Sequence, residues 1–476
     1  MGVEVPNETS WLQRAALRCC DWAERWIPDA YVFAALAVAI VAVVALLLGA
    51  SATRTAAAFA EGFWSLIPFT MQMSFILIGG YVVASSPPMQ RCIDYLACVP
   101  SSGRGAVCWV AVFSTLTSLL HWGLSSILGS LLVLALARRE NLKMDYRAAA
   151  AAAYLGMGSV WALGLSSSAA QLQANPASMP PALLPITGVL PFSQTIFLWQ
   201  SLLLTLLLIV ITTLIAWWTA PGDADARTAT HQELPPAPTV APRAPAASRP
   251  GEWLEYSPLL NLVIAALGGC WLVHEFASKS ALGAIANLNT YNFLFLMLGL
   301  LLCWRPRTFL DSAARAAPAV SGVLIQFPFY GGIAAIITLA AGPEGQSIAT
   351  RLATFFTSAV SREGFPVVIG VYSAVLGFFV PSGGGKWIIE APYVMQAANE
   401  LRVHLGWTVQ IYNAAEALPN LINPFWMLPL LGILRLKARE VIGFTIPQFI
   451  AHLPLVLLLL WLLGLTLEYQ PPVMPP

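Results

Sequence analysis

The chain has 476 residues, of which 58% are hydrophobic and 10% are charged, and its mean hydropathy is +0.72. Charged residues make up about a quarter of an ordinary soluble domain, so this composition excludes a soluble globular protein. It predicts an all-α polytopic membrane protein that has the lipid bilayer as its surroundings. The formal net charge of +1 points to no particular partner, and no basic run indicates nucleic acid.

In chain order, residues 1–29 contain no apolar run, so we expect no cleavable signal peptide. Their Trp and Arg residues predict an amphipathic segment at the cytoplasmic membrane surface. Beyond them, apolar stretches of roughly the 20 residues that cross a bilayer predict a series of spanning helices. We expect these helices over residues 30–50, 62–84, 146–170, 192–219, 253–276, 289–304, 319–341, 408–433 and 441–466.

Two further apolar stretches, 105–137 and 364–396, do not fit a single span. As a straight helix each would run about 50 Å, which is too long for one crossing and short for two crossings with a turn. The first is interrupted at His121-Trp122-Gly123 and has basic residues at both ends, which favours both ends on one side of the membrane. The second breaks at Pro381 to Gly385. We therefore expect two re-entrant hairpins.

The two hairpin stretches also resemble each other in sequence. Phe113-Ser114 precedes Tyr372-Ser373 by 259 residues, and Leu119-Leu120 precedes Phe378-Phe379 by the same distance. Similar pairs occur outside the hairpins at nearly the same spacing, which indicates a duplicated unit. An odd number of expected crossings separates the copies, so the second copy would be inverted relative to the first.

This reasoning divides the chain into five parts. After the segment 1–29 come a first membrane repeat over 30–219, a disordered cytoplasmic linker over 220–252, a linking helix over 253–276 and a second repeat over 277–476. Each repeat would contain a re-entrant hairpin and a broken helix. Amphipathic arms along the membrane surface are expected before the hairpins, over residues 86–104 and 345–363.

The distribution of basic residues gives the orientation. This map places few of the 24 lysines and arginines on the side of the membrane opposite the N-terminus. They are Arg54, Lys279, Arg351, Arg362, Lys386 and Arg402. The positive-inside rule therefore predicts a cytoplasmic N-terminus, an extracytoplasmic C-terminus and a multi-pass protein of a bacterial inner membrane.

The hairpin tips contain the candidate substrate ligands. A cation at membrane depth is costly and marks a candidate functional site, and Lys386 follows three glycines whose amides could turn toward a carboxylate. His121 could donate to the same group, and hydroxyls near it would lie at a helix N-terminus. The alternatives are a lysine that reaches water and a histidine that only packs. The candidates are His121, Ser125, Ser126, Ser382, Gly383, Gly384, Gly385 and Lys386.

The broken helices contain the candidates for a coupling ion. Carbonyls freed by a break, together with Asn and Glu side chains, suit Na⁺, and a buried glutamate suits H⁺. Glu416 is the best single candidate, although it could instead make a structural hydrogen bond to a neighbouring helix; Glu390 is a weaker candidate. The expected coupling residues are Ser166, Ser167, Ser168, Glu416, Asn420 and Asn423.

Several motifs resemble the bacterial short-chain fatty acid transporter family. They include Phe379 to Gly385 with Trp387, the segment Gln326 to Tyr330, and Pro424-Phe425-Trp426. The resemblance covers nearly the whole chain except the linker. It implies uptake of short-chain monocarboxylates such as acetoacetate or butyrate, kinship to a wider ion-transporter superfamily, and an elevator-type architecture that usually works as a homodimer.

We therefore expect a secondary active transporter, a symporter coupled to H⁺ or Na⁺, with no cofactor besides that ion. One alternative is a carrier for dicarboxylates or other organic anions, but a dianion would favour a second fixed cation beside Lys386. Another is an anion channel, which would need a continuous polar lining. An intramembrane enzyme is disfavoured because no metal-ligand pair or Ser–His arrangement is evident across the spans.

Overall fold

The computed structural model describes residues 30–474 apart from 177–178, 181, 224–225, 230–248, 280, 381 and 424. The expected segment 1–29 and most of the expected linker 220–252 lie outside the described residues. Within them the chain is helical and forms no named strand, and an isolated bridge joins Gly188 to Val473. The prediction of an all-α fold is confirmed.

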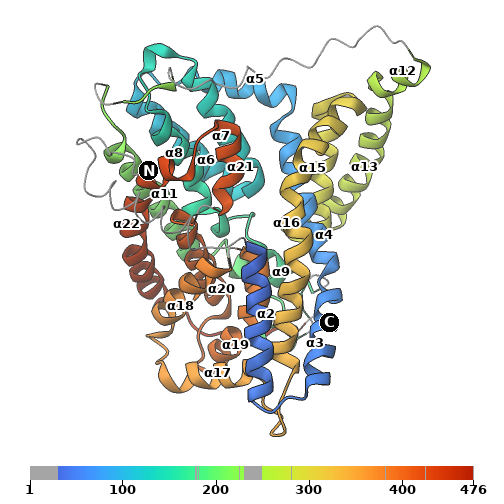
Figure 1. Ribbon diagram of the computed structural model, residues 1–476, viewed down its shortest axis with the longest axis vertical. Coiled ribbons are helices and arrows are strands. Elements are labelled where there is room, and N and C mark those ends of the chain that lie inside the picture. The colour runs from blue at the N-terminus through green and yellow to red at the C-terminus, as the bar shows by residue number, and fades with distance from the viewer. Residues whose placement is uncertain are drawn as a thin grey trace, which may run out of the picture.

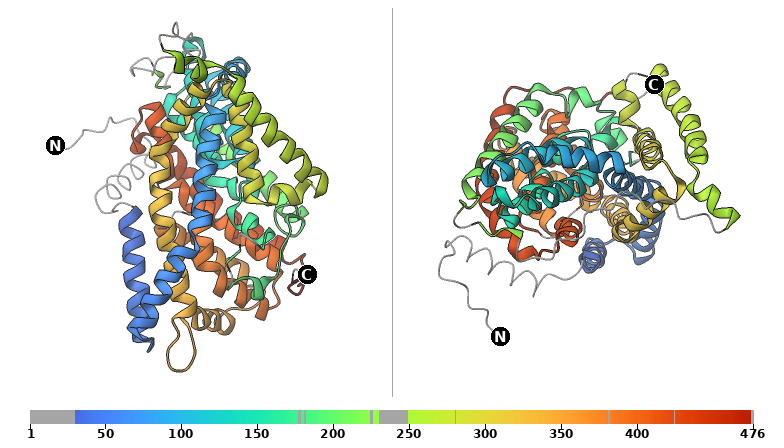
Figure 2. Two further views of the ribbon diagram at one scale, coloured as in Figure 1. Left: turned by 90° about the vertical axis from the view of Figure 1, so that its right-hand side faces the viewer. Right: turned by 90° about the horizontal axis from the view of Figure 1, so that it is seen from above.

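The helices form two groups that lie side by side (Figure 1). Helix α16 is the centre of the first group and packs along α2, α3 and α4, while α15 lies against α4 and α13 lies outside α15. Viewed from above, α13 stands at the edge of the molecule (Figure 2). The helices of this first group are α2 (Ala30–Leu47), α3 (Ala52–Ser65), α4 (Ile67–Ala84), α13 (Leu259–Ser278), α15 (Leu288–Cys303) and α16 (Pro306–Leu339).

The second group is built around two helical hairpins and two interrupted helices. Helices α6 and α7 form the first hairpin, α18 and α19 the second, and each hairpin packs on an interrupted helix, α8 or α20. The group consists of α6 (Gly103–Leu120), α7 (Trp122–Ala137), α8 (Tyr146–Ser159), α9 (Ser168–Ala174), α11 (Trp199–Thr219), α18 (Phe365–Phe379), α19 (Gly383–Glu400), α20 (Leu405–Ala417), α21 (Leu428–Leu434) and α22 (Ala438–Gly464).

Two short helices run between the groups at opposite ends of the molecule. Helix α5 (Pro87–Leu96) contacts α7 and α15, and α17 (Ile348–Ala359) contacts α19 and α16. Figure 1 places α5 at the top and α17 at the bottom. They lie within the stretches expected to form arms. The remaining short helices are α10 (Leu184–Thr187), α12 (Pro250–Tyr256) and α14 (Ala281–Ala286), with 3-10 turns at Glu140–Leu142, Trp161–Leu163, Phe192–Gln194, Leu418–Leu421 and Phe425–Met427.

Several expected helix limits were wrong because the apolar stretch that crosses lipid is shorter than the helix that contains it. The helix expected over 319–341 begins at Pro306, and the one expected over 62–84 is two abutting helices that begin at Ala52 and meet at Leu66. Proline favours such starts, because it occupies the first turn of α4 and of α16. The expected spans 146–170 and 408–433 are interrupted, as predicted for the broken helices, since α8 and α20 end at Ser159 and Ala417.

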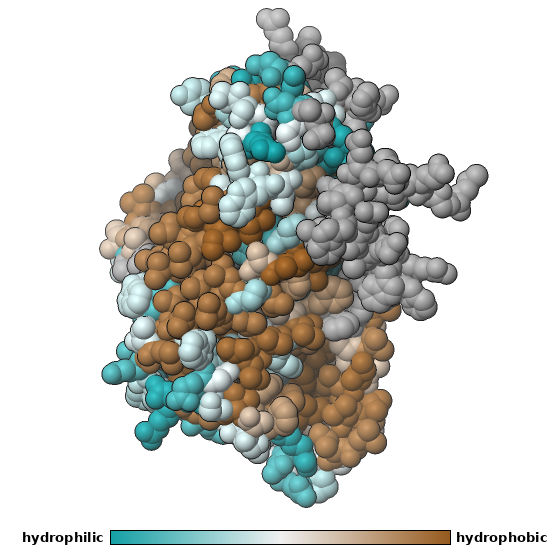
Figure 3. Space-filling model, turned by 90° about the vertical axis from the view of Figure 1, so that its left-hand side faces the viewer, coloured by the Kyte–Doolittle hydropathy of each residue, from teal (hydrophilic) through white to brown (hydrophobic). Residues whose placement is uncertain are grey.

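The surface and the helix lengths fit a membrane. Within the described residues, seven apolar helical stretches have the length and composition to cross a bilayer. Figure 3 shows a face on which apolar side chains form a broad band between hydrophilic upper and lower ends. Exposed leucines such as Leu206 of α11 and Leu458 of α22 have no protein partner to cover them and suit lipid. The chain is a multi-pass membrane protein.

Candidate functional site

The tip of the second hairpin lies between α18, which ends at Phe379, and α19, which begins at Gly383. Ser382 caps α19, since its Oγ accepts a hydrogen bond from the Gly385 amide at 3.2 Å. The three glycines form the buried first turn of the helix rather than an open loop. Their amide groups are therefore less free to turn toward a ligand than the sequence suggested.

The glycine run allows aromatic rings to approach the helix closely. A Cβ on Gly383 would lie 2.3 Å from the ring of Trp161, one on Gly384 would lie 2.6 Å from Phe69, and one on Gly385 would lie 2.4 Å from Tyr330. Phe69 and Tyr330 belong to the first group of helices. The run is thus a contact surface between the two groups.

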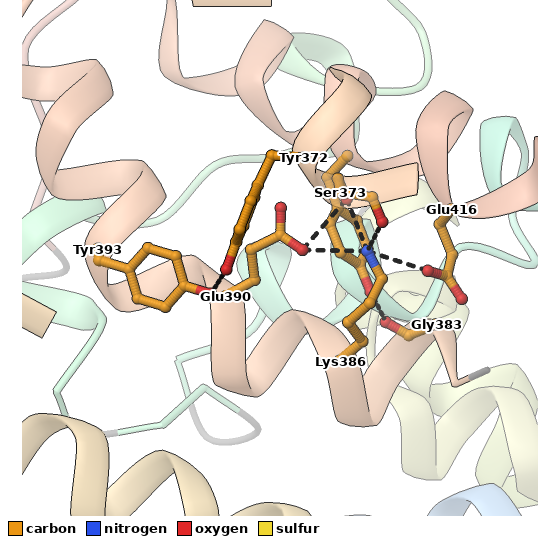
Figure 4. A network of polar contacts seen from close by, with 8 residues as sticks. Tyr372, Ser373, Gly383, Lys386, Glu390, Tyr393 and Glu416 are labelled. Carbon is orange, nitrogen blue, oxygen red and sulfur yellow. Dashed lines mark hydrogen bonds and ion pairs between the residues drawn. The ribbon is translucent and has the colours of Figure 1, made fainter. Parts of the chain in front are cut away.

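Lys386 lies one residue further along α19, and its side chain is completely buried. Its Nζ donates to the Ser373 carbonyl at 3.0 Å, to Ser373 Oγ at 2.6 Å and to Glu390 Oε2 at 3.0 Å. The Oε2 of Glu416, from α20, is also 3.0 Å away (Figure 4). The Tyr412 ring centroid is 4.2 Å from Nζ. The alternative that Lys386 reaches water is wrong.

The hydrogen bonds around Lys386 are unequally shared by the two glutamates. An ammonium has three N–H donors, and all three are used by Ser373 and Glu390. Glu390 Oε2 also accepts from Ser373 Oγ at 3.1 Å. Glu416 Oε2 is buried at the same 3.0 Å from Nζ but has no second donor beside Lys386. One cation therefore balances two carboxylates.

The interrupted helices meet each other beside this cluster. Ser167 Oγ donates to Asn413 Oδ1 at 3.0 Å, and it also accepts from an amide in the first turn of α9. Asn420 Nδ2 donates to the Met157 carbonyl at 3.1 Å, and Asn423 Nδ2 donates to the Phe378 carbonyl at 3.0 Å. Of the expected coupling residues, these three bind the interrupted helices to one another or to the second hairpin.

The first hairpin turns at His121, beside the break in α8. The amide of Trp122 donates to Ser166 Oγ at 2.5 Å, and the Ser166 amide donates to the Leu119 carbonyl at 3.1 Å. Ser168, at the start of α9, donates to Met73 Sδ of α4 at 3.7 Å. The serines expected at this break therefore hold the hairpin tip and the adjoining helices in place.

His121 packs against the first group of helices. Its Nδ1 accepts from the Leu124 amide at 3.1 Å, so it caps α7, and its buried ring packs on Tyr291 and Phe295 of α15. Ser125 Oγ donates to a carbonyl within the same hairpin. The expectation that these two residues join Lys386 around one ligand is not met in this conformation.

A cavity of about 1000 Å³ opens between the two groups, next to the first hairpin. Of the expected substrate ligands, Ser126 lines this cavity. Trp122 also lines it, and its ring centroid is 5.3 Å from that of Trp426. Arg315 of α16 brings positive charge to its wall, and Gln326 adds an amide. The rest of the lining is largely apolar and includes Tyr31, Leu77, Tyr81, Ile127, Met157, Ile325, Phe329, Pro429 and Ile433.

Comparison with known proteins decides the family. The model of a family described as short chain fatty acid transporter matches residues 11–463. The chain belongs to the short-chain fatty acid transporter family. It is 32% identical to an Escherichia coli (strain K12) protein over 423 residues, which cover 89% of this chain and 93% of that protein. It is 28% identical to one from Haemophilus influenzae over 458 residues, 95% of this chain and all of that protein. Both are provisionally named as short-chain fatty acid transporters.

Solved structures share the fold of this family member. The YdaH transporter of Alcanivorax borkumensis superposes with a TM-score of 0.60 at 16% identity, covering 92% of this chain and 98% of that one. MtrF of Neisseria gonorrhoeae, from a class of antimetabolite efflux pumps, superposes with a TM-score of 0.59 at 13% identity, covering 96% and 100%. The family is one of transporters, so the chain is a transporter and not an enzyme, and it acts on a small molecule at a membrane.

Two residues of this transporter were missed or undervalued in the sequence. Arg315 was assigned to a cytoplasmic end because the apolar stretch begins at 319, yet it shares a helix face with Gly322, Gln326 and Phe329. These three residues follow Arg315 by seven, eleven and fourteen positions, which are spacings of one helix face. That pattern could have predicted that Arg315 belongs to the helix. Glu390 stands four residues after Lys386, which places both on one face of a helix.

Proposed function

We propose that this protein is a symporter that takes up short-chain monocarboxylates, such as acetoacetate or butyrate, together with H⁺ or Na⁺ across a bacterial inner membrane. The observation that carries the proposal is the cavity between the two helix groups, which is largely apolar and has a cation in its wall. A short alkyl chain suits the apolar lining. A single carboxylate suits a single positive charge.

We assign the attraction of the anion to Arg315 rather than Lys386. The three donors of Lys386 are engaged, whereas Arg315 is exposed and makes a 3.4 Å hydrogen bond to Ser312. Gln326 stands eleven residues further along α16, about 16 Å deeper at the rise of an α-helix. Arg315 would attract the carboxylate into the cavity, and Ser126 and Gln326 would donate to it at depth.

We further propose the inverted-repeat, elevator-type architecture, in which the second group carries substrate past the first. Two observations support it. The element order from α2 to α8 recurs from α15 to α20, with a hairpin after a short connecting helix in each series. The α6–α7 hairpin occupies the upper half of Figure 1 and the α18–α19 hairpin the lower half. A homodimer that holds the first group still and a cytoplasmic N-terminus belong to the same proposal.

The test is uptake of labelled acetoacetate into proteoliposomes, with protein-free vesicles as background. A pH gradient and a Na⁺ gradient are imposed separately, and succinate is added as a competitor. Concentrative uptake under one gradient, unaffected by succinate, is the expected result. Inhibition by succinate would move the substrate class to dicarboxylates, and flux without accumulation under either gradient would favour a channel.

A further inference from the structure

The Lys386 cluster has an unbalanced charge in a dry place. Lys386, Glu390 and Glu416 are each at most 1% exposed, and their three side chains sum to one negative charge when all are ionised. A net charge that is buried and uncompensated is strongly unfavourable. A single bound proton makes the cluster neutral, so the arrangement is suited to load one proton.

We propose that the coupling ion is a proton and that Glu416 carries it, an inference that rests on the proposed symport and names its ion. Both glutamates have a carboxylate oxygen without a hydrogen-bond partner, Oε1 in Glu390 and Oε2 in Glu416. The ionised form of Glu390 is the more stabilised of the two, because its Oε2 accepts hydrogen bonds from Lys386 and Ser373. Glu416 Oε2 has Lys386 as its partner at ion-pair distance and has no second donor, so its ionised form is the less stabilised. One proton with one monocarboxylate makes each transport cycle electroneutral.

The surroundings of Glu416 leave room for this change. Lys386 and Glu390 face it from α19, the phenols of Tyr412 and Tyr330 face it from α20 and α16, and Gly377 faces it from α18. A Cβ on Gly377 would lie 3.0 Å from Glu416 Oε2, so the glycine spares space at that oxygen. Among the described residues, Lys386 is the cation within ion-pair distance of either glutamate.

The proton also has a mechanical consequence. Lys386, Ser373 and Glu390 all belong to the second hairpin, whereas Glu416 belongs to α20 (Figure 4). A proton on Glu416 removes the charge that attracts it to Lys386 and leaves the bonds within the hairpin unchanged. Loading the proton therefore loosens the hairpin from the interrupted helix and, at the same time, removes the net charge that opposes movement through the membrane.

The experiment compares wild type with Glu416→Gln in proteoliposomes that contain acetoacetate. In wild type we expect acetoacetate entry to carry protons inward, measured with an internal pH dye, at one proton per acetoacetate. In Glu416→Gln we expect proton entry and gradient-driven accumulation to fall at least tenfold, and exchange of internal for external acetoacetate to become independent of pH. Glu416→Asp, which retains a carboxyl group, should restore proton entry.

The possible outcomes test the proton assignment separately from the proposed symport. Proton entry in Glu416→Gln, or accumulation in wild type driven by Na⁺ without a pH gradient, overturns the proton assignment and leaves the symport standing. Absence of acetoacetate exchange in wild type overturns both.

A second measurement does not depend on transport by the variant. Infrared difference spectra of the purified protein in lipid should show the C=O stretch of a protonated carboxyl group on acidification. One component of that band should be missing from Glu416→Gln and retained in Glu61→Gln, which removes an exposed carboxyl group of α3. An unchanged band in Glu416→Gln overturns the proposal.

Discussion

Lys386 Nζ lies 3.0 Å from Glu416 Oε2, although the two residues belong to different helices and both side chains are buried. Most of α19 and most of α20 separate them along the chain, so only the packing of α19 on α20 brings them together. The pair ties the tip region of the second hairpin to the interrupted helix. Glu416 also pairs with the cation, Lys386, that a substrate carboxylate would otherwise bind.

Removing Lys386 should destabilise the protein strongly. Lys386→Met leaves two buried carboxylates without their cation, and breaking a buried pair in this way costs about 3–5 kcal/mol. We expect a clearly lower melting temperature in detergent. Lys386→Met/Glu416→Gln should recover part of the loss, because it removes one of the uncompensated charges.

The matched control is Lys279→Met. Lys279 pairs with Glu275 at 2.5 Å but its side chain is 47% exposed, and exposed pairs contribute about 0–1 kcal/mol. Its melting temperature should stay close to that of wild type. Equal effects of the two substitutions would contradict the buried cluster.

The local features of the fold could be predicted from the sequence, and the partners across helices could not. Apolar stretches and their interruptions located the turn at His121 and predicted a break at residues 164–168, within the helix expected over 146–170, because both depend on neighbouring residues. The helix in fact ends earlier, at Ser159. The meeting of Lys386 with Glu416, by contrast, depends on tertiary packing that no periodicity records. A charged lysine at membrane depth is costly without a partner, and the sequence predicted a substrate carboxylate or water for Lys386 rather than the two protein carboxylates that it meets.

The role of the glycine run shows the same limit. A run of glycines before a lysine is compatible with amides that bind an anion and with a helix that other rings approach closely. Only the positions of Phe69 and Tyr330, which lie far away in the chain, select the second role. His121 likewise caps a helix and packs on Tyr291, a use that its apolar surroundings permitted without specifying.

Gly384→Ala should impair transport. The added Cβ would lie 2.6 Å from the Phe69 ring and 3.2 Å from Ser168 Cβ, so the ring or the second hairpin must shift at the contact between the two groups. We expect at least a tenfold loss of acetoacetate uptake. Gly269→Ala is the control, because Gly269 is also helical and has nothing within 4 Å of its Cβ position. It should retain uptake and gain up to about 1 kcal/mol from helix propensity. Normal uptake by Gly384→Ala would show that the close contact is not needed.

Arg315→Gln should weaken the apparent affinity for the substrate. The change removes the positive charge from the cavity wall, so we expect KM for acetoacetate to rise about tenfold, the factor that corresponds to about 1.4 kcal/mol, with little change in maximal rate. Arg307→Gln is a control on the same helix, since Arg307 is half exposed and pairs with Asp311 at 3.2 Å. An unchanged KM in Arg315→Gln would remove this residue from the binding site.

A cross-link between the two groups should stop transport if the second group moves. Gly80 of α4 and His121 of the first hairpin are close, since a Cβ on Gly80 would lie 2.6 Å from His121 Cε1. We expect Hg²⁺ to bridge cysteines at these two positions, in a background from which the seven native cysteines are removed. Uptake should fall to the background of empty vesicles and return when a thiol reductant removes the bridge.

The control for this cross-link lies within one group. A Cβ on Gly299 of α15 would lie 2.8 Å from Val82 Cγ1 of α4, and both helices belong to the first group. Cysteines at Gly299 and Val82 should also be bridged, but uptake should continue, because a rigid first group has no need to change at this contact. Both pairs must retain uptake before Hg²⁺ is added, which separates the effect of the bridge from that of the substitutions. Continued uptake with the Gly80–His121 bridge fully formed would exclude movement of the first hairpin relative to α4, and with it the elevator motion.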